Sequence, residues 1–213
     1  MAAFAGSMGV AFVILGLSRL SQISPESIVL AGVAISSMFT GATTLLQYFA
    51  DEVELTTLTF WTFGDLGSTT YGQIGFMFLV VLFTSIYFIF HRWDFNALLA
   101  GTETAASLGI HVRRLILANM VLCCLAASTI VSYVGLINFI GLVAPHIVRR
   151  LVGNNHIYLI PGAILAGASL LLLGDLLART IVSPVILPIG AITSFLGAPL
   201  FLYLLFKRRK SVC

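Results

Sequence analysis

The chain has 213 residues, of which 59% are hydrophobic and only 9% are charged, and its mean hydropathy is +1.07. A soluble domain needs about a quarter of its residues charged to cover its surface, so this composition excludes a soluble globular protein and indicates an integral membrane protein. The net charge of +3 comes from basic residues scattered among short loops, which does not indicate a nucleic-acid-binding protein.

Seven apolar segments are candidates for membrane-spanning helices, which need about 20 mostly apolar residues. In chain order they are Ala2–Ser18, Ile28–Ala50, Gln73–Phe90, Leu115–Tyr133, Leu136–Leu151, Tyr158–Leu177 and Leu187–Phe206. The fourth and fifth nearly merge, and only Ser132–Gly135 offers a tight turn between them. We therefore predict an all-α fold: a single polytopic transmembrane helix bundle over residues 1–213, with about seven spanning helices.

Basic residues collect on one side of these segments. Counting the loops in alternation puts on that side Arg19, Arg92, Arg113, Arg114, Arg149, Arg150 and Lys207–Lys210. The other side carries Arg179 together with Asp51, Glu52, Glu54 and Asp65. Because cytoplasmic loops are enriched in Lys and Arg, we predict that the basic side and the carboxyl terminus are cytoplasmic. Seven spans then place the amino terminus outside, which we interpret as a sign that upstream helices are missing.

The connection between the third and fourth spans, His91–Arg114, is too long for a simple turn and carries helix signals of its own. Asn96 is a candidate N-cap for a short helix that Gly101 would end. Thr102 is a candidate N-cap for a second turn that Gly109 would end. We predict two short helices separated by a glycine, forming a rigid knob at the cytoplasmic surface.

This predicted knob has the composition of a surface that inserts into a groove on another protein. The residues expected on its exposed faces are small or aliphatic: Ala97, Leu98, Leu99, Ala100, Ala105, Ala106 and Leu108. The alternative is an amphipathic segment lying on lipid headgroups, which favours Lys, Arg and Trp within the helix. None of these occurs between Asn96 and Ile110, and Glu103 also disfavours this alternative.

The fifth span ends in an unusual set of side chains. Arg149 and Arg150 suit a helix end at the water interface. Pro145 is expected to kink or end the helix, because its ring and missing N–H disturb the preceding turn. His146 is interpreted as a hydrogen-bonding interface residue, since no second metal ligand lies at helical spacing from it. We expect no metal site.

Several stretches together match a known family pattern. They are "LAGTETAASLGI", "GLINFIGLVAPHIVRRLVG", "IPGAILAGASLLLLGDLLAR", "LPIGAITSFLGAPLFLYLL", "VLAGVAISSMFTGA" and "FWTFGDLGS". In order and over essentially the whole chain, they resemble the FecCD-type permease subunits of ABC importers for iron–siderophores, haem and cobalamin. The most specific part is the pattern G-x-I-x-F-[VI]-G-L-x-x-P-H-x-x-R, present here from Gly135 to Arg149.

The resemblance implies a ten-helix permease that works as a homodimer in a prokaryotic cell membrane with two cytoplasmic ATPase subunits. The chain has no G-x-x-x-x-G-K-[ST] phosphate loop, so ATP is expected in the partner subunit, and no enzymatic activity or cofactor is expected here. The knob resembles the helices that couple to the ATPase, through Ala97, Leu98, Ala100, Gly101, Glu103, Ala105, Leu108 and Gly109. The resemblance also implies a structural or ATPase-facing role for Pro145, His146 and Arg149.

On the outer side, Arg179 follows Asp175 by four positions, so an ion pair within one helix is available. The resemblance implies instead that Arg179 docks a carboxylate of an extracytoplasmic substrate-binding protein, with Asp175 orienting the guanidinium. It also implies a gate region at Ser24, Pro25, Glu26 and Ser27. Val53–Gly67 resembles an outer segment with a short helix, although its aromatic residues would equally suit the membrane interface.

Two pairs of small residues, Gly32/Ser36 and Gly162/Ala166, have a spacing that indicates helix packing more often than a substrate path. The resemblance implies that the family's first three helices have no counterpart in this sequence. The prediction is a permease subunit for an iron(III)-siderophore or a related metal chelate. The alternatives are a truncated or split-gene fragment without transport of its own and, least favoured, a membrane enzyme using His146 or Asp175.

Overall fold

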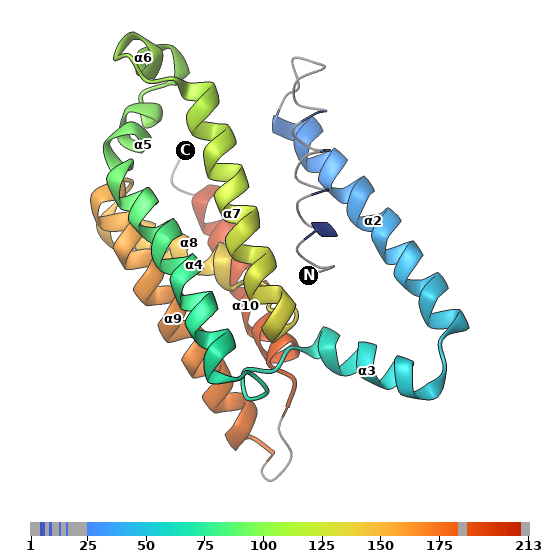
Figure 1. Cartoon of the computed structure of the whole chain (residues 1–213). Helices are drawn as coiled ribbons and strands as arrows, with labels where there is room; N and C mark the ends of the chain where they lie inside the picture. The colour runs from blue at the N-terminus through green and yellow to red at the C-terminus, as the bar shows by residue number, and fades with distance from the viewer. Residues whose placement is uncertain are drawn as a thin grey trace.

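The computed structural model describes residues 25–182 and 187–209, together with five positions before residue 25. The first predicted span, Ala2–Ser18, therefore lies mostly outside the described residues. Within the described ranges every regular element is an α-helix, as predicted (Figure 1). The helices are α2 (Pro25–Phe49), α3 (Glu52–Phe63), α4 (Tyr71–Phe90), α5 (Arg92–Leu99), α6 (Thr102–Ser107), α7 (Val112–Val134), α8 (Ile140–Val152), α9 (His156–Thr180) and α10 (Ile189–Arg209).

Three of the described helices, α4, α7 and α9, are long and apolar enough to cross a membrane. They have 20, 23 and 25 residues and contain the third, fourth and sixth predicted spans. Many large apolar side chains of α4 and α9 are exposed in the single chain, as expected of helices that face lipid or neighbouring subunits, whereas most of those of α7 are half-buried. Composition and length thus fix these three elements.

The boundary between the fourth and fifth predicted spans was wrong. Ser132 lies inside α7, where its hydroxyl donates to the Ser128 carbonyl at 2.7 Å, and the turn occupies residues 135–139 instead. The fifth predicted span corresponds to α8, which has only 13 residues. At about 1.5 Å per residue it is roughly 20 Å long, which is shorter than a hydrocarbon core of about 30 Å. By length, α8 alone does not span.

The core lies where α8, α9 and α10 pack against one another. Buried side chains of α8 are Val143, Ala144 and Val148, and those of α9 include Leu159 and Ala178. Gly162 of α9 lies directly against Val148, because a methyl group added at this glycine would come within 2.6 Å of the valine Cγ1. The packing role predicted for the Gly162/Ala166 pair is thus confirmed for Gly162.

Helices α2 and α3 lie at the side of this bundle (Figure 1). Asp51 caps α3 by accepting a hydrogen bond from the Glu54 N–H at 2.8 Å. The far end of α3 contacts α10, whereas α2 stands apart from the other helices (Figure 1). A methyl group at Gly32 of α2 would meet nothing within 4 Å, so the packing predicted for Gly32/Ser36 does not occur within the described part of the chain.

The end of α3, the turn after α7 and the start of α10 approach one another closely at three glycines. They are Gly64, Gly135 and Gly190, and a Cβ on any of them would collide with a backbone oxygen. At Gly64 and Gly190 that oxygen belongs to Leu136, at 2.9 and 2.6 Å, and at Gly135 it belongs to Trp61. Three chain segments therefore touch through their backbones, a contact that only glycine permits.

Candidate functional site

One end of the bundle carries most of the basic side chains and is here called the basic end; the other is the acidic end. The basic end holds Arg92, Arg113, Arg114, Arg149 and Arg150. The acidic end holds Asp51, Glu52, Glu54, Asp65 and Asp175. Helices α5 and α6 project from the basic end (Figure 1), and residues 92–109 are called the knob.

The knob contains the two short helices that the sequence predicts. Gly101 separates them with φ of 112°, and Gly109 follows α6 with φ of 85°. Both values lie in the left-handed region, where a side chain would be strained. The composition of the segment, with a glycine after each short helix, therefore dictates its two sharp changes of direction.

Both predicted N-caps of the knob were wrong. Helix α5 begins at Arg92, so Asn96 lies in its middle and its side chain points to α9 instead. The residue that caps α6 is Gly101, and Thr102 is the first residue of that helix. Helix α5 follows α4 almost directly, with only His91 between them. It therefore begins four residues before Asn96, which cannot be its N-cap.

The residues predicted to contact another protein differ in their exposure. Leu108 is 68% exposed, and Glu103, Ala100, Gly101 and Gly109 are exposed as well. Ala97 and Leu98 are half-buried. Ala105 is fully buried, so its predicted exposure was wrong, because this side of α6 faces α7. The exposed tip of the knob is therefore centred on α6 and Leu108.

A cleft of about 480 Å³ lies under the knob, between the end of α4 and the start of α7. It contains side chains of both charge signs, Asp94 and Arg114, together with His91 and His111. The His91 Nδ1 lies 3.0 Å from the Tyr87 carbonyl, which fixes its ring at the wall. Sequence reasoning missed this cleft because its residues come from three separate elements, and only their common position at the basic end could have indicated it.

The segment with Pro145, His146 and Arg149 lies on α8. Pro145 was expected to kink or end the helix; it does not end it, because α8 continues to Val152. His146 is half-buried, with its ring 5.9 Å from that of Phe201 on α10. Arg149 is exposed in the last turn, and the described residues contain no group of His, Cys, Asp and Glu suited to a metal ion.

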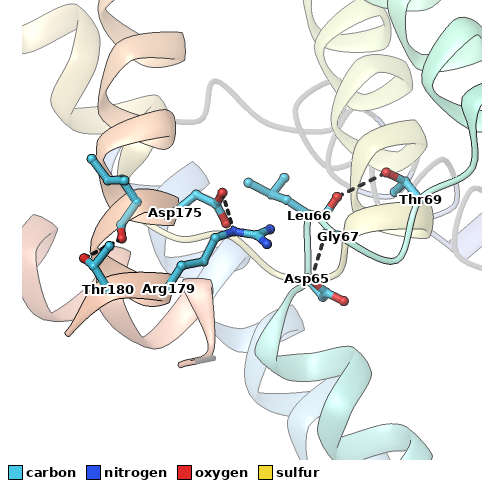
Figure 2. Close-up of polar contacts among 8 residues, drawn as sticks. Asp65, Leu66, Gly67, Thr69, Asp175, Arg179 and Thr180 are labelled. Atoms are coloured by element: carbon cyan, nitrogen blue, oxygen red, sulfur yellow. Dashed lines mark hydrogen bonds and ion pairs between the residues drawn. The ribbon is translucent and has the colours of Figure 1, made fainter. Parts of the chain in front are cut away.

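At the acidic end, Arg179 and Asp175 form the ion pair that their spacing allows (Figure 2). The Arg179 Nε donates to the Asp175 Oδ2 at 2.8 Å, and the arginine side chain is 43% exposed. The guanidinium also lies against the loop after α3, because a methyl group at Gly67 would be 3.5 Å from its Nη2. That loop is folded by Asp65, which accepts from the Gly67 N–H at 2.8 Å (Figure 2).

A second cavity, of about 390 Å³, opens at the acidic end beside this loop. Its walls include the aromatic rings of Phe60, Trp61, Phe63 and Tyr133, with Asp65 at its edge. Sequence reasoning treated Trp61 and Phe63 as interfacial aromatics or parts of an outer segment. The structure brings them together with Tyr133 from the end of α7.

The predicted gate region lies at the start of α2. Ser24 is outside the described residues, and Pro25, Glu26 and Ser27 form the first turn of the helix. Further along α2, Ser36, Thr40, Thr43 and Gln47 recur at helical spacing and share one face. The Thr40 and Thr43 hydroxyls donate to the carbonyls of Ser36 and Phe39, each at 2.9 Å.

A family model described as the FecCD transport family matches residues 1–207. The chain belongs to this family. A solved structure described as an inward-facing conformation of a metal-chelate type ABC transporter is similar to it, with a TM-score of 0.83 and 30% identity. That similarity covers 96% of this chain and 72% of the solved one.

Curated relatives of this FecCD-family chain are named as permeases. A Methanocaldococcus jannaschii protein named as an ABC transporter permease is 50% identical over 99% of the chain, which spans 60% of that relative. A hemin transport permease of Yersinia pestis is 37% identical over 98%, and a Fe(3+)-citrate import permease of Bacillus subtilis is 36% identical over 98%. The chain spans 62% of the length of each.

Proposed function

We propose that this chain acts as a permease subunit of an ABC importer that moves an iron(III)-siderophore or a related metal chelate into the cytoplasm. The observation that carries the proposal is the knob, a structured two-helix projection on a membrane bundle of the FecCD family. The named substrates of the relatives, hemin, Fe(3+)-citrate and vitamin B12, support a metal chelate as the substrate class. ATP would be hydrolysed by a separate ATPase subunit.

The knob is proposed as the surface that docks on this ATPase, with the basic end in the cytoplasm. Its exposed tip combines an apolar side chain, Leu108, with the acidic Glu103. A central apolar anchor with a charged rim is typical of protein docking sites. The left-handed glycines Gly101 and Gly109 set the two changes of chain direction that present this tip away from the bundle.

The path for the chelate is proposed to run along α2, between this chain and a second copy. The face with Ser36, Thr40, Thr43 and Gln47 is polar, while α2 as a whole is apolar. Polar side chains in a spanning helix usually face a bundle interior or a water-filled cavity. Since α2 stands apart from the other helices (Figure 1), that interior would be completed by another protein segment.

Arg179 is proposed to bind a carboxylate of an extracytoplasmic substrate-binding protein at the acidic end. Asp175 holds the guanidinium through Nε, which leaves the two terminal nitrogens with donors available to a second carboxylate. A charge at the rim of an interface sets orientation and the rate of encounter more than it sets affinity.

Arg179→Glu is expected to slow association with the binding protein by about tenfold at low salt, because it replaces an attractive charge with a repulsive one beside Asp175. Surface plasmon resonance on the permease in nanodiscs measures this rate. The matched control is Thr180→Ala, whose hydroxyl donates only within its own helix, to Leu176, at 2.8 Å. An unchanged association rate in Arg179→Glu would contradict the docking role.

The experiment that tests the proposed function is co-purification of the chain with its ATPase in detergent, followed by uptake into proteoliposomes. The expected result is a complex that imports radiolabelled ferric siderophore or hemin only when ATP is enclosed and the binding protein is outside. Parallel assays with ferric siderophore, hemin and cobalamin identify the chelate. A chain that captures no ATPase would overturn the proposal and favour the alternative, a permease fragment without transport of its own.

A further inference from the structure

The side chain of Asn96 joins α5 to the start of α9, about sixty positions later in the chain. Its Nδ2 donates to the Asn155 Oδ1 at 2.9 Å. Its Oδ1 accepts from the His156 N–H at 2.8 Å and lies 3.0 Å from the His156 Nδ1. One half-buried amide therefore uses both of its ends on a single neighbouring helix.

Aromatic contacts and a second hydrogen bond to Asn155 add to the same contact between α5 and α9. The Phe95 ring lies 5.7 Å from the His156 ring and 5.9 Å from that of Phe88 at the end of α4. The Asn155 Oδ1 that receives Asn96 also accepts from the Ile157 N–H at 3.0 Å, which caps α9. The Asn155 oxygen thus takes part both in the cap of α9 and in the link between α9 and α5.

The two short helices of the knob are held by different long helices. Helix α6 packs against α7, and the turn between them is closed by the Ile110 N–H, which donates to the Ala105 carbonyl at 3.1 Å. Helix α5 is tied to α9 through Asn96. Helix α9 has 25 residues and is about 37 Å long, and its other end carries the Asp175–Arg179 pair.

We propose that Asn96 is a positioning residue that transmits movement of the knob to α9, and so to the acidic end of the bundle. This inference rests on the proposed function, because it assumes that an ATPase moves the knob. Without the Asn96 link, a displaced α5 would move α4, to which it is joined by the chain, and α9 would follow only through packing contacts such as that of Phe95 with His156. ATP would then be hydrolysed without a matching movement at the far end.

The test compares the amount of chelate imported per ATP hydrolysed in proteoliposomes that contain the permease, its ATPase and the binding protein. Asn96→Ala is expected to retain the ATPase and hydrolyse ATP, with import per ATP about fivefold lower, the lower range of coupling between two sites. Asn155→Ala should behave alike. Asn155→Asp should resemble the wild type, because a carboxylate still accepts both hydrogen bonds and suits a helix N-terminus. An unchanged ratio in Asn96→Ala would overturn the inference.

A second measurement needs no ATPase and separates this inference from the proposed function. Spin labels replace the exposed Trp93 on α5 and Tyr158 on α9, which are 63% and 61% exposed, in a chain whose native cysteines are changed to serine. The Asn96→Ala variant should broaden the distribution of distances between the labels, whereas the control Asn154→Ala, at an exposed neighbour, should not. A distribution unchanged by Asn96→Ala would overturn the link even if transport is established. A wild-type chain that captures no ATPase would overturn the proposed function. The distance distribution between the labels would still show whether Asn96 holds α5 to α9.

Discussion

Replacing Gly135 with valine is expected to abolish the stable folded protein in detergent. Gly135 has φ of 81°, and its Cβ position collides with the Trp61 carbonyl and lies 2.9 Å from the Gly64 Cα. A strained backbone costs about 1–3 kcal/mol, and overpacking a close contact costs a further 1–3 kcal/mol or so. This sum is a large part of the about 5–15 kcal/mol that stabilises a typical protein.

The measurement is the temperature at which the monodisperse elution peak of a fluorescent fusion disappears after heating. The matched control is Gly141→Ala, in the first turn of α8, where an added methyl group meets nothing within 4 Å. This control should match the wild type or exceed it slightly, since alanine is the better helix former. A Gly135→Val protein that elutes and melts like the wild type would show that the three segments do not touch as described.

Leu108→Asp is expected to lose the ATPase while the membrane bundle remains folded. The leucine side chain is 68% exposed, so the fold gains little from it. If the knob docks as proposed, the carboxylate would be buried without a partner, which costs well over the roughly 2 kcal/mol that defines an interface hot spot. Affinity for the ATPase should therefore fall by at least about 30-fold.

Co-purification at matched concentrations checks this prediction, with the melting temperature of the isolated permease as the control for folding. Leu108→Met preserves volume and apolar character, so it should keep the ATPase. Retention of the ATPase by Leu108→Asp would move the docking surface away from the tip of α6. The remaining exposed candidates would then be Ala100, Gly101, Glu103 and Gly109.

The helices that the sequence predicted well are those with a simple local cause. Long apolar runs produce α4, α7 and α9, and the two glycines Gly101 and Gly109 set the ends of the short helices because their backbones take left-handed angles. The turn after α7 was misplaced for the opposite reason. It uses Phe139 with φ of 65°, a conformation that a bulky residue adopts only when its surroundings impose it.

The site was less predictable than the fold because its contacts are distant in the chain. Asn96 has the residue type of a helix cap, and nothing near it indicates that Asn155 and His156 occupy its hydrogen-bonding groups. The burial of Ala105 depends on which side of a six-residue helix meets α7. By contrast, the pairing of Asp175 with Arg179 needs only a spacing of four.

The threonines of α2 determine how strongly this helix could hold a passing molecule. The hydroxyl protons of Thr40, Thr43 and Thr44 are already donated to carbonyls one turn earlier, at 2.9, 2.9 and 3.0 Å. These side chains offer acceptor lone pairs and methyl groups but no free donor. A chelate rich in anionic oxygens would find no strong binding position along them, so the energy profile of its passage would be shallow and its residence on the helix short.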